Sequence, residues 1–190
     1  AKALIKLGDN FKQKDHEIFN KLENISGKII DGRKNAFPGE VISDFLQENK
    51  NFFPKLEEFA NQIFDKVKQN NRTRYIALCQ FLKDEYGITV KDVIPKEGKP
   101  FSKIYKVKDK ELLLSDYLSL ETKKLFAAAQ ISQEGASKEI DEYLSTFSFP
   151  TNESKKLTRV ALLNYCGAAI LMPYSLFHKE CKELKYDLEL

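Results

Sequence analysis

Histidine, tryptophan and paired cysteine are scarce in this chain of 190 residues, and these shortages exclude several kinds of site. The only two histidines are His16 and His178, which excludes any site that needs two or three clustered imidazoles. The three cysteines, Cys79, Cys166 and Cys181, form no CxxC pair, and an odd number cannot pair completely within the chain. Cys79 and Cys166 lie in apolar sequence, where a reduced cysteine behaves as a small hydrophobic residue. We therefore expect a reducing, cytoplasmic setting.

Long apolar runs and a strong charge of one sign are absent too. The longest apolar run, residues 165–174, includes a glycine and a proline and is far shorter than the roughly 18 residues of a membrane span. No apolar signal-peptide core opens the sequence. The net charge of +3 is too small to indicate nucleic-acid binding by itself. The 42% of hydrophobic residues is enough for one good core but hardly for two full domains.

The spacing of the apolar residues is helical at both ends of the chain and strand-like in the middle. Asn51 is expected to cap one helix and Thr151 another, while Gly87 is expected to end a helix. Helices are predicted over residues 1–30, 40–46, 52–67, 73–86, 120–132, 137–147, 151–172 and 176–188, and three strands between residues 88 and 114, two of them in a hairpin. This order predicts an α+β fold that is mostly helical with a small three-stranded sheet. We expect residues 1–70 to form a helical linker or dimerisation segment and residues 71–190 the core.

The hairpin segment, residues 95–110, combines six lysines with Phe101 and Tyr105. Ammonium groups neutralise phosphate and aromatic rings stack on bases, so such a segment is able to hold a phosphorylated ligand. Lysines also keep an exposed edge strand soluble. Both interpretations stay open, with the soluble edge favoured.

Arginine is rare beside abundant lysine, and three of the four arginines lie at notable places. Arg72 and Arg74 flank the start of a predicted helix, and Arg159 lies in a strongly apolar one. A guanidinium makes bidentate contacts that lysine cannot, so an anion site is one interpretation and a structural ion pair the other. His178 and Cys181 share a helix face, but two ligands make no metal site, and we predict no bound metal.

The sequence RVALLNYCGAAILMPY, residues 159–174, resembles the "AN-FAA-LLMP" helix of the ImmA/IrrE family. More narrowly, it is similar to the middle domain of XRE-type transcriptional regulators that sense short-chain fatty acyl-CoA. Residues 40–58 (EVISDFLQENKNFFPKLEE) and 183–190 (ELKYDLEL) agree in the same order. The resemblance implies a zincin-like core preceded by N-terminal helices. It also implies that a helix-turn-helix domain and a Cys-containing C-terminal domain lie outside this sequence.

Family members with peptidase activity carry HExxH on the helix after the hairpin and a glutamate ligand on the later helix. The resemblance places Gln130 and Glu134 at the two histidine positions and Ile131 at the catalytic glutamate. The third ligand falls at Val160 or Leu162. Every element of the zinc site is missing, so we expect no metal, no catalytic residue and no hydrolysis.

The sequence therefore predicts a ligand-sensing regulatory domain that binds a short-chain acyl-CoA or related acyl metabolite and bears no other cofactor. Its expected partners are DNA, through a domain outside this sequence, and a second copy in a homodimer, with no membrane. Small residues at 127–129 and 167–169 are expected to open an acyl slot between two helices. The predicted ligand contacts are Arg72, Arg74, Tyr105, Gln130, Arg159, Asn164 and Tyr165. Two rivals remain: a dead zincin-like dimerisation or protein-interaction module without a small ligand, and direct nucleic-acid binding through the hairpin.

Overall fold

A computed structural model describes residues 38–68, 73–96 and 100–184 of the chain. The elements are α2 (Pro38–Glu48), α3 (Pro54–Lys68), α4 (Arg74–Tyr86), β1 (Thr89–Val93), β2 (Lys103–Lys106), β3 (Glu111–Ser115), α5 (Leu120–Gly135), α6 (Ser137–Ser145), α7 (Asn152–Leu171) and α8 (Tyr174–Glu183). This order confirms the predicted α+β class, mostly helical with one small sheet. The helix predicted over residues 1–30 lies outside the described residues.

Local sequence signals set most helix ends. The Thr151 hydroxyl accepts from the backbone N–H of Ser154, whose own hydroxyl accepts from the Thr151 backbone, so the predicted cap is a reciprocal capping box. Gly87 ends α4 in the left-handed region at φ 70°, as predicted. The predicted cap at Asn51 is wrong. Its backbone N–H donates to the Leu46 carbonyl and its φ is 53°, so it closes α2, and α3 begins at Pro54.

The three strands form a mixed sheet in the order β1–β3–β2. The hairpin partners β2 and β3 are antiparallel, with Tyr105 opposite Leu112, while β1 runs parallel to β3, with Val90 opposite Leu112. Leu112 and Leu114 of the central strand are fully buried. Leu113, between them, is only partly buried, so one face of β3 packs on the helices.

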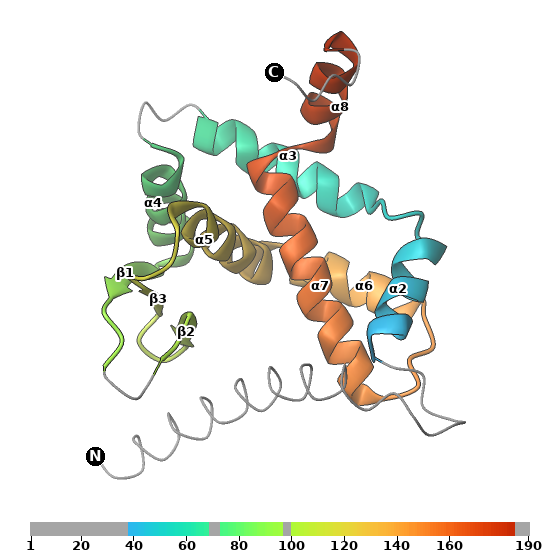
Figure 1. The fold of residues 1–190 in the computed structure, drawn as a ribbon, viewed down its shortest axis with the longest axis horizontal. Helices are drawn as coiled ribbons and strands as arrows, with labels where there is room; N and C mark the ends of the chain where they lie inside the picture. Colours follow the sequence, from blue (N-terminus) through green and yellow to red (C-terminus); the bar gives the residue numbers. More distant parts are fainter. Residues whose placement is uncertain (1–37, 69–72, 97–99, 185–190) are drawn as a thin grey trace.

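The long helix α7 crosses the middle of the molecule, with α2, α3, α5 and α6 packed around it (Figure 1). It contacts α5 most closely. A methyl group added at Gly167 would lie 2.9 Å from the backbone nitrogen of Ala129, so the two backbones nearly touch. The small residues at 127–129 and 167–169 therefore close the space between α5 and α7. The expectation that they open an acyl slot is wrong, because small side chains equally allow two helices to approach each other.

Helices α2 and α3 belong to the same hydrophobic core as the helices after residue 70. Phe45 and Phe53 are fully buried and stack at 5.8 Å between ring centroids, and Leu56 and Ala60 of α3 are buried as well. Residues 38–68 are thus part of the packed body. The dimerisation role assigned to residues 1–70 stays a prediction.

Helix α8 projects from the body at the end near α3 (Figure 1). It follows α7 after a bend of 55°, and it has no buried residue. Within the described residues, no single helix is long and apolar enough to cross a membrane. Helices α7 and α8 have the necessary length and composition only when they are taken together, and they are bent relative to each other.

Candidate functional site

The positions at which a zincin would hold its metal carry unsuitable donors in this chain. On α5, the Gln130 amide donates to the Glu134 carboxylate at 2.8 Å. Ile131, at the position of the catalytic glutamate, is fully buried. On α7, Leu162 is fully buried and Val160 is 51% exposed. Zinc sites in proteins are built from cysteine, histidine and carboxylate ligands, so this set does not fit a zinc ion. The described part of the chain holds no group of three or more such side chains arranged to bind a metal.

Among the described residues, Tyr105, Gln130 and Glu134 are the predicted ligand contacts and zincin positions that come together. Tyr105 lies on β2, close enough to the Glu134 carboxylate of α5 for that carboxylate to affect its pKa. Partial burial, followed by the Glu134 carboxylate, raises the pKa of Tyr105. The group offers hydrogen bonds but no cation to a ligand.

Two of the three predicted arginine contacts are engaged inside the protein. Arg74 donates to the Leu171 carbonyl at 3.3 Å and lies over the Phe64 ring at 4.8 Å. Arg159 pairs with Asp141 and donates to the Ser137 hydroxyl at 3.1 Å. These contacts favour the structural ion-pair interpretation for Arg159. Arg72 lies outside the described residues.

Tyr165 faces the interior rather than a cleft. Its hydroxyl donates to the Glu57 carboxylate at 2.6 Å and accepts from the Phe53 backbone N–H at 3.4 Å. Burial and then the Glu57 carboxylate raise the pKa of Tyr165. The other Glu57 oxygen accepts from the backbone N–H of Tyr174, so Glu57 joins α3, α7 and the start of α8. Asn164, the neighbour of Tyr165 on α7, is exposed.

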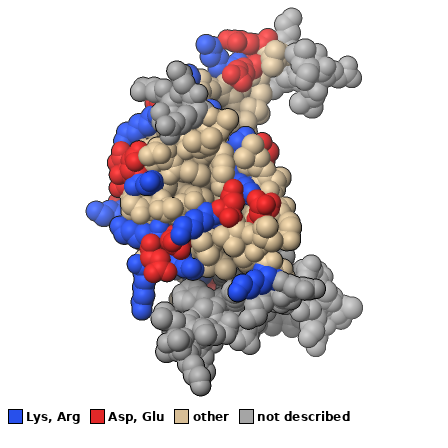
Figure 2. Space-filling model, turned by 90° about the vertical axis from the view of Figure 1, so that its left-hand side faces the viewer, with Lys and Arg blue, Asp and Glu red and all other residues tan. Residues whose placement is uncertain are grey.

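Three of the six lysines in the hairpin segment have contacts within the protein. Lys106 pairs with Glu111, which also pairs with Lys91 of β1, and Lys110 donates to the Tyr86 carbonyl at the end of α4. Lys103 lies over the Phe126 ring at 5.4 Å. Figure 2 shows basic and acidic side chains interspersed over the face that carries the sheet, not one basic field. This arrangement favours the soluble edge over the phosphate-binding interpretation.

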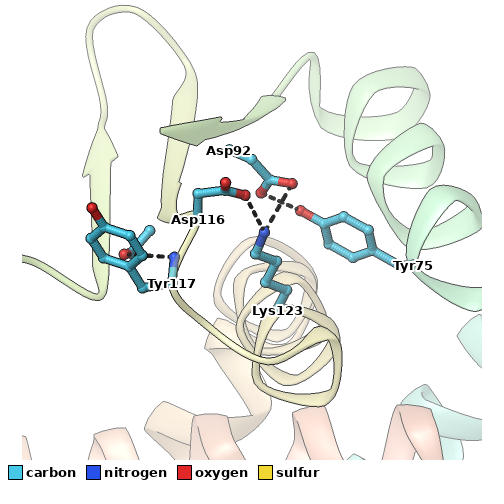
Figure 3. Close-up of polar contacts among 6 residues, drawn as sticks. Tyr75, Asp92, Asp116, Tyr117 and Lys123 are labelled. Atoms are coloured by element: carbon cyan, nitrogen blue, oxygen red, sulfur yellow. Dashed lines mark hydrogen bonds and ion pairs between the residues drawn. The ribbon is translucent and has the colours of Figure 1, made fainter. Parts of the chain in front are cut away.

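A buried lysine joins the sheet to α5, and the sequence interpretation missed it (Figure 3). The Lys123 ammonium lies 3.2 Å from the Asp92 carboxylate of β1 and 3.1 Å from that of Asp116, which follows β3. The Tyr75 hydroxyl of α4 donates to Asp92 at 2.9 Å. Burial opposes the charge on Lys123, but its hydrogen bonds to Asp116 and Asp92 outweigh burial and raise its pKa. The network holds α4, α5 and the sheet in register; no local sequence signal pairs residues so far apart.

Next to this network is an open cavity of about 490 Å³. Aromatic and apolar side chains make its walls, with serines between them and one lysine; the lining residues are Pro95, Lys96, Pro100, Phe101, Ser102, Ser115, Tyr117 and Leu118. Ser115 is buried and its hydroxyl accepts from the Tyr117 backbone N–H at 3.3 Å. The volume lies in the range of small-molecule sites. Lys96 and Phe101 of this lining belong to the basic, aromatic segment that the sequence already singles out.

Comparison with known families identifies the core. The sequence profile of the IrrE N-terminal-like domain, a peptidase M78 family, matches residues 83–190, more than half of the chain. The chain belongs to this family. The IrrE-like match starts inside α4 and covers the sheet, α5 and α7, where the altered zinc positions lie.

Similar proteins come from mycobacteria. The HTH-type transcriptional regulator PrpR of Mycobacterium tuberculosis (strain H37Rv) is 27% identical over 155 residues, which are 80% of this chain and 31% of that protein. The HTH-type transcriptional regulator RamB of strain CDC 1551 is 24% identical over 154 residues, 81% of this chain and 32% of RamB. A solved structure described as a Mycobacterium tuberculosis transcriptional regulator is 26% identical, with a TM-score of 0.72 over 81% of this chain and 46% of that one. This IrrE-like chain thus spans about a third of the length of these two curated relatives.

Proposed function

We propose that this IrrE-like chain is the ligand-sensing regulatory domain of a bacterial transcription factor and binds a short-chain acyl-CoA or related acyl metabolite. The observation that carries the proposal is its similarity to two transcriptional regulators over four fifths of its length. The replacement of zinc ligands by Gln130 and Leu162 supports binding rather than peptide hydrolysis. In this proposal the protein is cytoplasmic, DNA is bound by a domain outside this sequence, and the ligand shifts a homodimer equilibrium.

The cavity beside β3 is the proposed seat of the acyl end. An acyl-CoA needs an apolar pocket for its acyl and pantetheine chain and cations for its phosphates. Phe101 and Leu118 offer apolar walls, and Lys96 is an exposed lysine at the cavity. Tyr105 and Gln130 define a second proposed location over α5. Arg72, Arg74, Arg159, Asn164 and Tyr165 stay proposed contacts that only ligand binding tests.

Isothermal titration of the whole chain with acetyl-, propionyl-, butyryl- and hexanoyl-CoA, and with free CoA, tests the proposal. We expect saturable heat that depends on acyl length, and at least about tenfold weaker binding in F101A and Y117A, since each removes a wall of the pocket. V107A changes an exposed residue of the hairpin turn outside the cavity and is the matched control.

Loss of binding in Y105F and Q130A, with F101A unchanged, would place the ligand over α5 instead. Flat traces with every chain length would overturn the sensor function and favour the interaction module without a small ligand. Native mass spectrometry of the purified chain gives an independent check, because a co-purified ligand adds its mass to the protein.

A further inference from the structure

Ser115 is a buried polar residue in the wall of the open cavity beside β3. It is only 3% exposed, and it is the one buried residue among the described residues that line the cavity. Phe101 and Leu118 of the same lining are partly buried, and Tyr117 is 78% exposed. Ligand pockets are mostly apolar and carry a few polar groups that fix the orientation of the ligand. Ser115 provides such a group at the buried side of this cavity.

The hydrogen bonds of Ser115 within the chain leave one donor unused. Its backbone N–H donates to the Ser102 carbonyl at 3.0 Å, and its carbonyl accepts from the Leu118 N–H at 3.2 Å. Its hydroxyl oxygen accepts from the Tyr117 N–H at 3.3 Å. A serine hydroxyl also has one proton to donate, and no residue of the described chain accepts it. Because a buried donor without an acceptor costs free energy, an acceptor atom on a ligand would stabilise this site.

The turn that carries Ser115 is fixed from its other side. Three of the four residues 115–118 line the cavity, whereas the carboxylate of the fourth, Asp116, lies 3.1 Å from the Lys123 ammonium of α5. Figure 3 shows the Asp116 side chain toward Lys123 and the Tyr117 ring on the opposite side of the turn. The hydroxyl of Ser115 is thus held in place before a ligand arrives, which lowers the entropic cost of binding.

The charges beside the cavity favour a neutral acceptor over an anionic one. Asp92 and Asp116 share the single ammonium of Lys123, so the two carboxylates exceed the cation by one negative charge. A ligand carboxylate buried against one neutral hydroxyl beside this excess charge would lose its hydration without a cation to replace it. A carbonyl oxygen accepts the same hydrogen bond without that cost. The cavity therefore fits the carbonyl of a thioester better than the carboxylate of a free acid.

We propose that the Ser115 hydroxyl donates to the carbonyl oxygen of an acyl thioester, so that this cavity distinguishes thioesters from free acids and from thioethers. This role of Ser115 rests on the proposed function, because it assigns the acyl carbonyl within the proposed seat of the acyl end. Ser115 is then a specificity-determining residue, and the apolar lining residues hold the acyl chain.

Isothermal titration of the whole chain with butyryl-CoA, S-butyl-CoA and butyrate tests this role. S-butyl-CoA has a methylene group in place of the carbonyl and is otherwise the same ligand. We expect wild type to bind butyryl-CoA at least about tenfold more tightly than S-butyl-CoA, the effect of one hydrogen bond, and to bind butyrate more weakly still. S115A is expected to bind the two CoA compounds equally, and S115T, which keeps the hydroxyl, to restore the preference. S175A changes an exposed serine of α8 outside the cavity and, as the matched control, is expected to keep it.

Infrared spectroscopy of bound butyryl-CoA with a carbon-13 label at the carbonyl gives a readout that a change in packing alone does not move. A hydrogen bond to a carbonyl lowers its stretching frequency. We therefore expect a shift to lower frequency on binding to wild type and a smaller shift on binding to S115A. The measurement on wild type needs no variant to fold, and a carbonyl band that stays unshifted would overturn the proposal.

Three outcomes would overturn the role of Ser115 and leave the sensor function standing. They are equal affinities of wild type for butyryl-CoA and S-butyl-CoA, a preference that S115A retains, and butyrate bound as tightly as butyryl-CoA. Flat traces with the whole acyl-CoA series would instead overturn the sensor function and the role of Ser115 together. Equal thermal midpoints of S115A and wild type would show that the variant's fold is intact.

Discussion

The consecutive helices α7 and α8 differ more in environment than any other pair in the described chain. Helix α7 has seven buried residues and contacts four other helices, whereas α8 has none buried. Only Met172 and Pro173 separate them. In α7 the apolar residues form part of the core, whereas in α8 they lie at the surface. Because one helix is buried and the other exposed, the same reaction measured on both compares a buried with an exposed environment within one protein.

The two thiols on these helices should differ most. Burial raises the pKa of Cys166 to about 11, with further contributions from Glu57 and Glu139, so only about 0.1% or less is thiolate at neutral pH. Cys181 lies half-exposed on α8. We expect iodoacetamide to alkylate Cys181 at least about 100-fold faster than Cys166 in the folded protein at low protein concentration, as followed by peptide mass spectrometry.

The rate at Cys166 should rise with pH up to about pH 11, since its thiolate fraction grows until that pKa. In guanidinium chloride the two rates should converge. Equal rates in the folded protein would mean that the core around α7 opens readily.

Substitution of Gly167 by valine should be the most destabilising single change. A side chain there collides with the Ala129 backbone at 2.9 Å and forces α5 and α7 apart, at a cost of about 3 kcal/mol in the free energy of unfolding. The neighbouring Ala168 is exposed, and A168V should cost no more than about 0.7 kcal/mol, the helix propensity of valine. Urea unfolding measures both; equal losses would contradict the close contact.

Removal of the Glu57 carboxylate should weaken the junction between the two helices. E57A leaves the part-buried Tyr165 hydroxyl and the Tyr174 backbone N–H without their acceptor, which costs about 2 kcal/mol. E57Q keeps an acceptor oxygen and should lose less. The exposed neighbour Glu58 provides the control, because E58A should change the unfolding free energy by about 0.5 kcal/mol or less.

The Lys123 network should give a smaller and pH-dependent effect. Its carboxylates are partly exposed, so K123M should cost about 1 kcal/mol at pH 7. The pKa of Lys123 is raised in the folded state, so its contribution is complete below the usual value near 10.5 and disappears as the pH rises above it. The stability gap between wild type and K123M should therefore be constant from pH 7 to 9 and shrink beyond pH 10.5.

Lys124, paired with Glu121 on the same helix, provides the control for this measurement. K124M should cost about 0.3 kcal/mol. A gap for K123M that stays constant to pH 12 would show that the lysine stabilises the fold by packing rather than by charge.

The sequence predicts those helix ends and strands that residues close together in the chain determine. Thr151 and Gly87 mark helix ends by their own hydrogen bonds and backbone angles, and β-branched residues near Val90 mark strands, so these elements are confirmed. Asn51 misled because a residue able to cap one helix is equally able to close the preceding one in a left-handed conformation.

The site was less predictable, because its contacts cross long stretches of chain. Glu57 and Tyr165 are 108 positions apart, and Lys123 reaches Asp92 on another element. Nothing local marks such partners. The basic, aromatic hairpin did mark Phe101, but composition did not show that Glu111 pairs with its Lys106.

The central place of α7 has a consequence for biosynthesis. Helices α2 and α3 are made first, yet they pack on α7, whose residues come about a hundred positions later. The core therefore cannot close on the ribosome until nearly the whole domain has emerged, and until then the apolar faces of α2 and α3 are exposed to the nascent chain's surroundings.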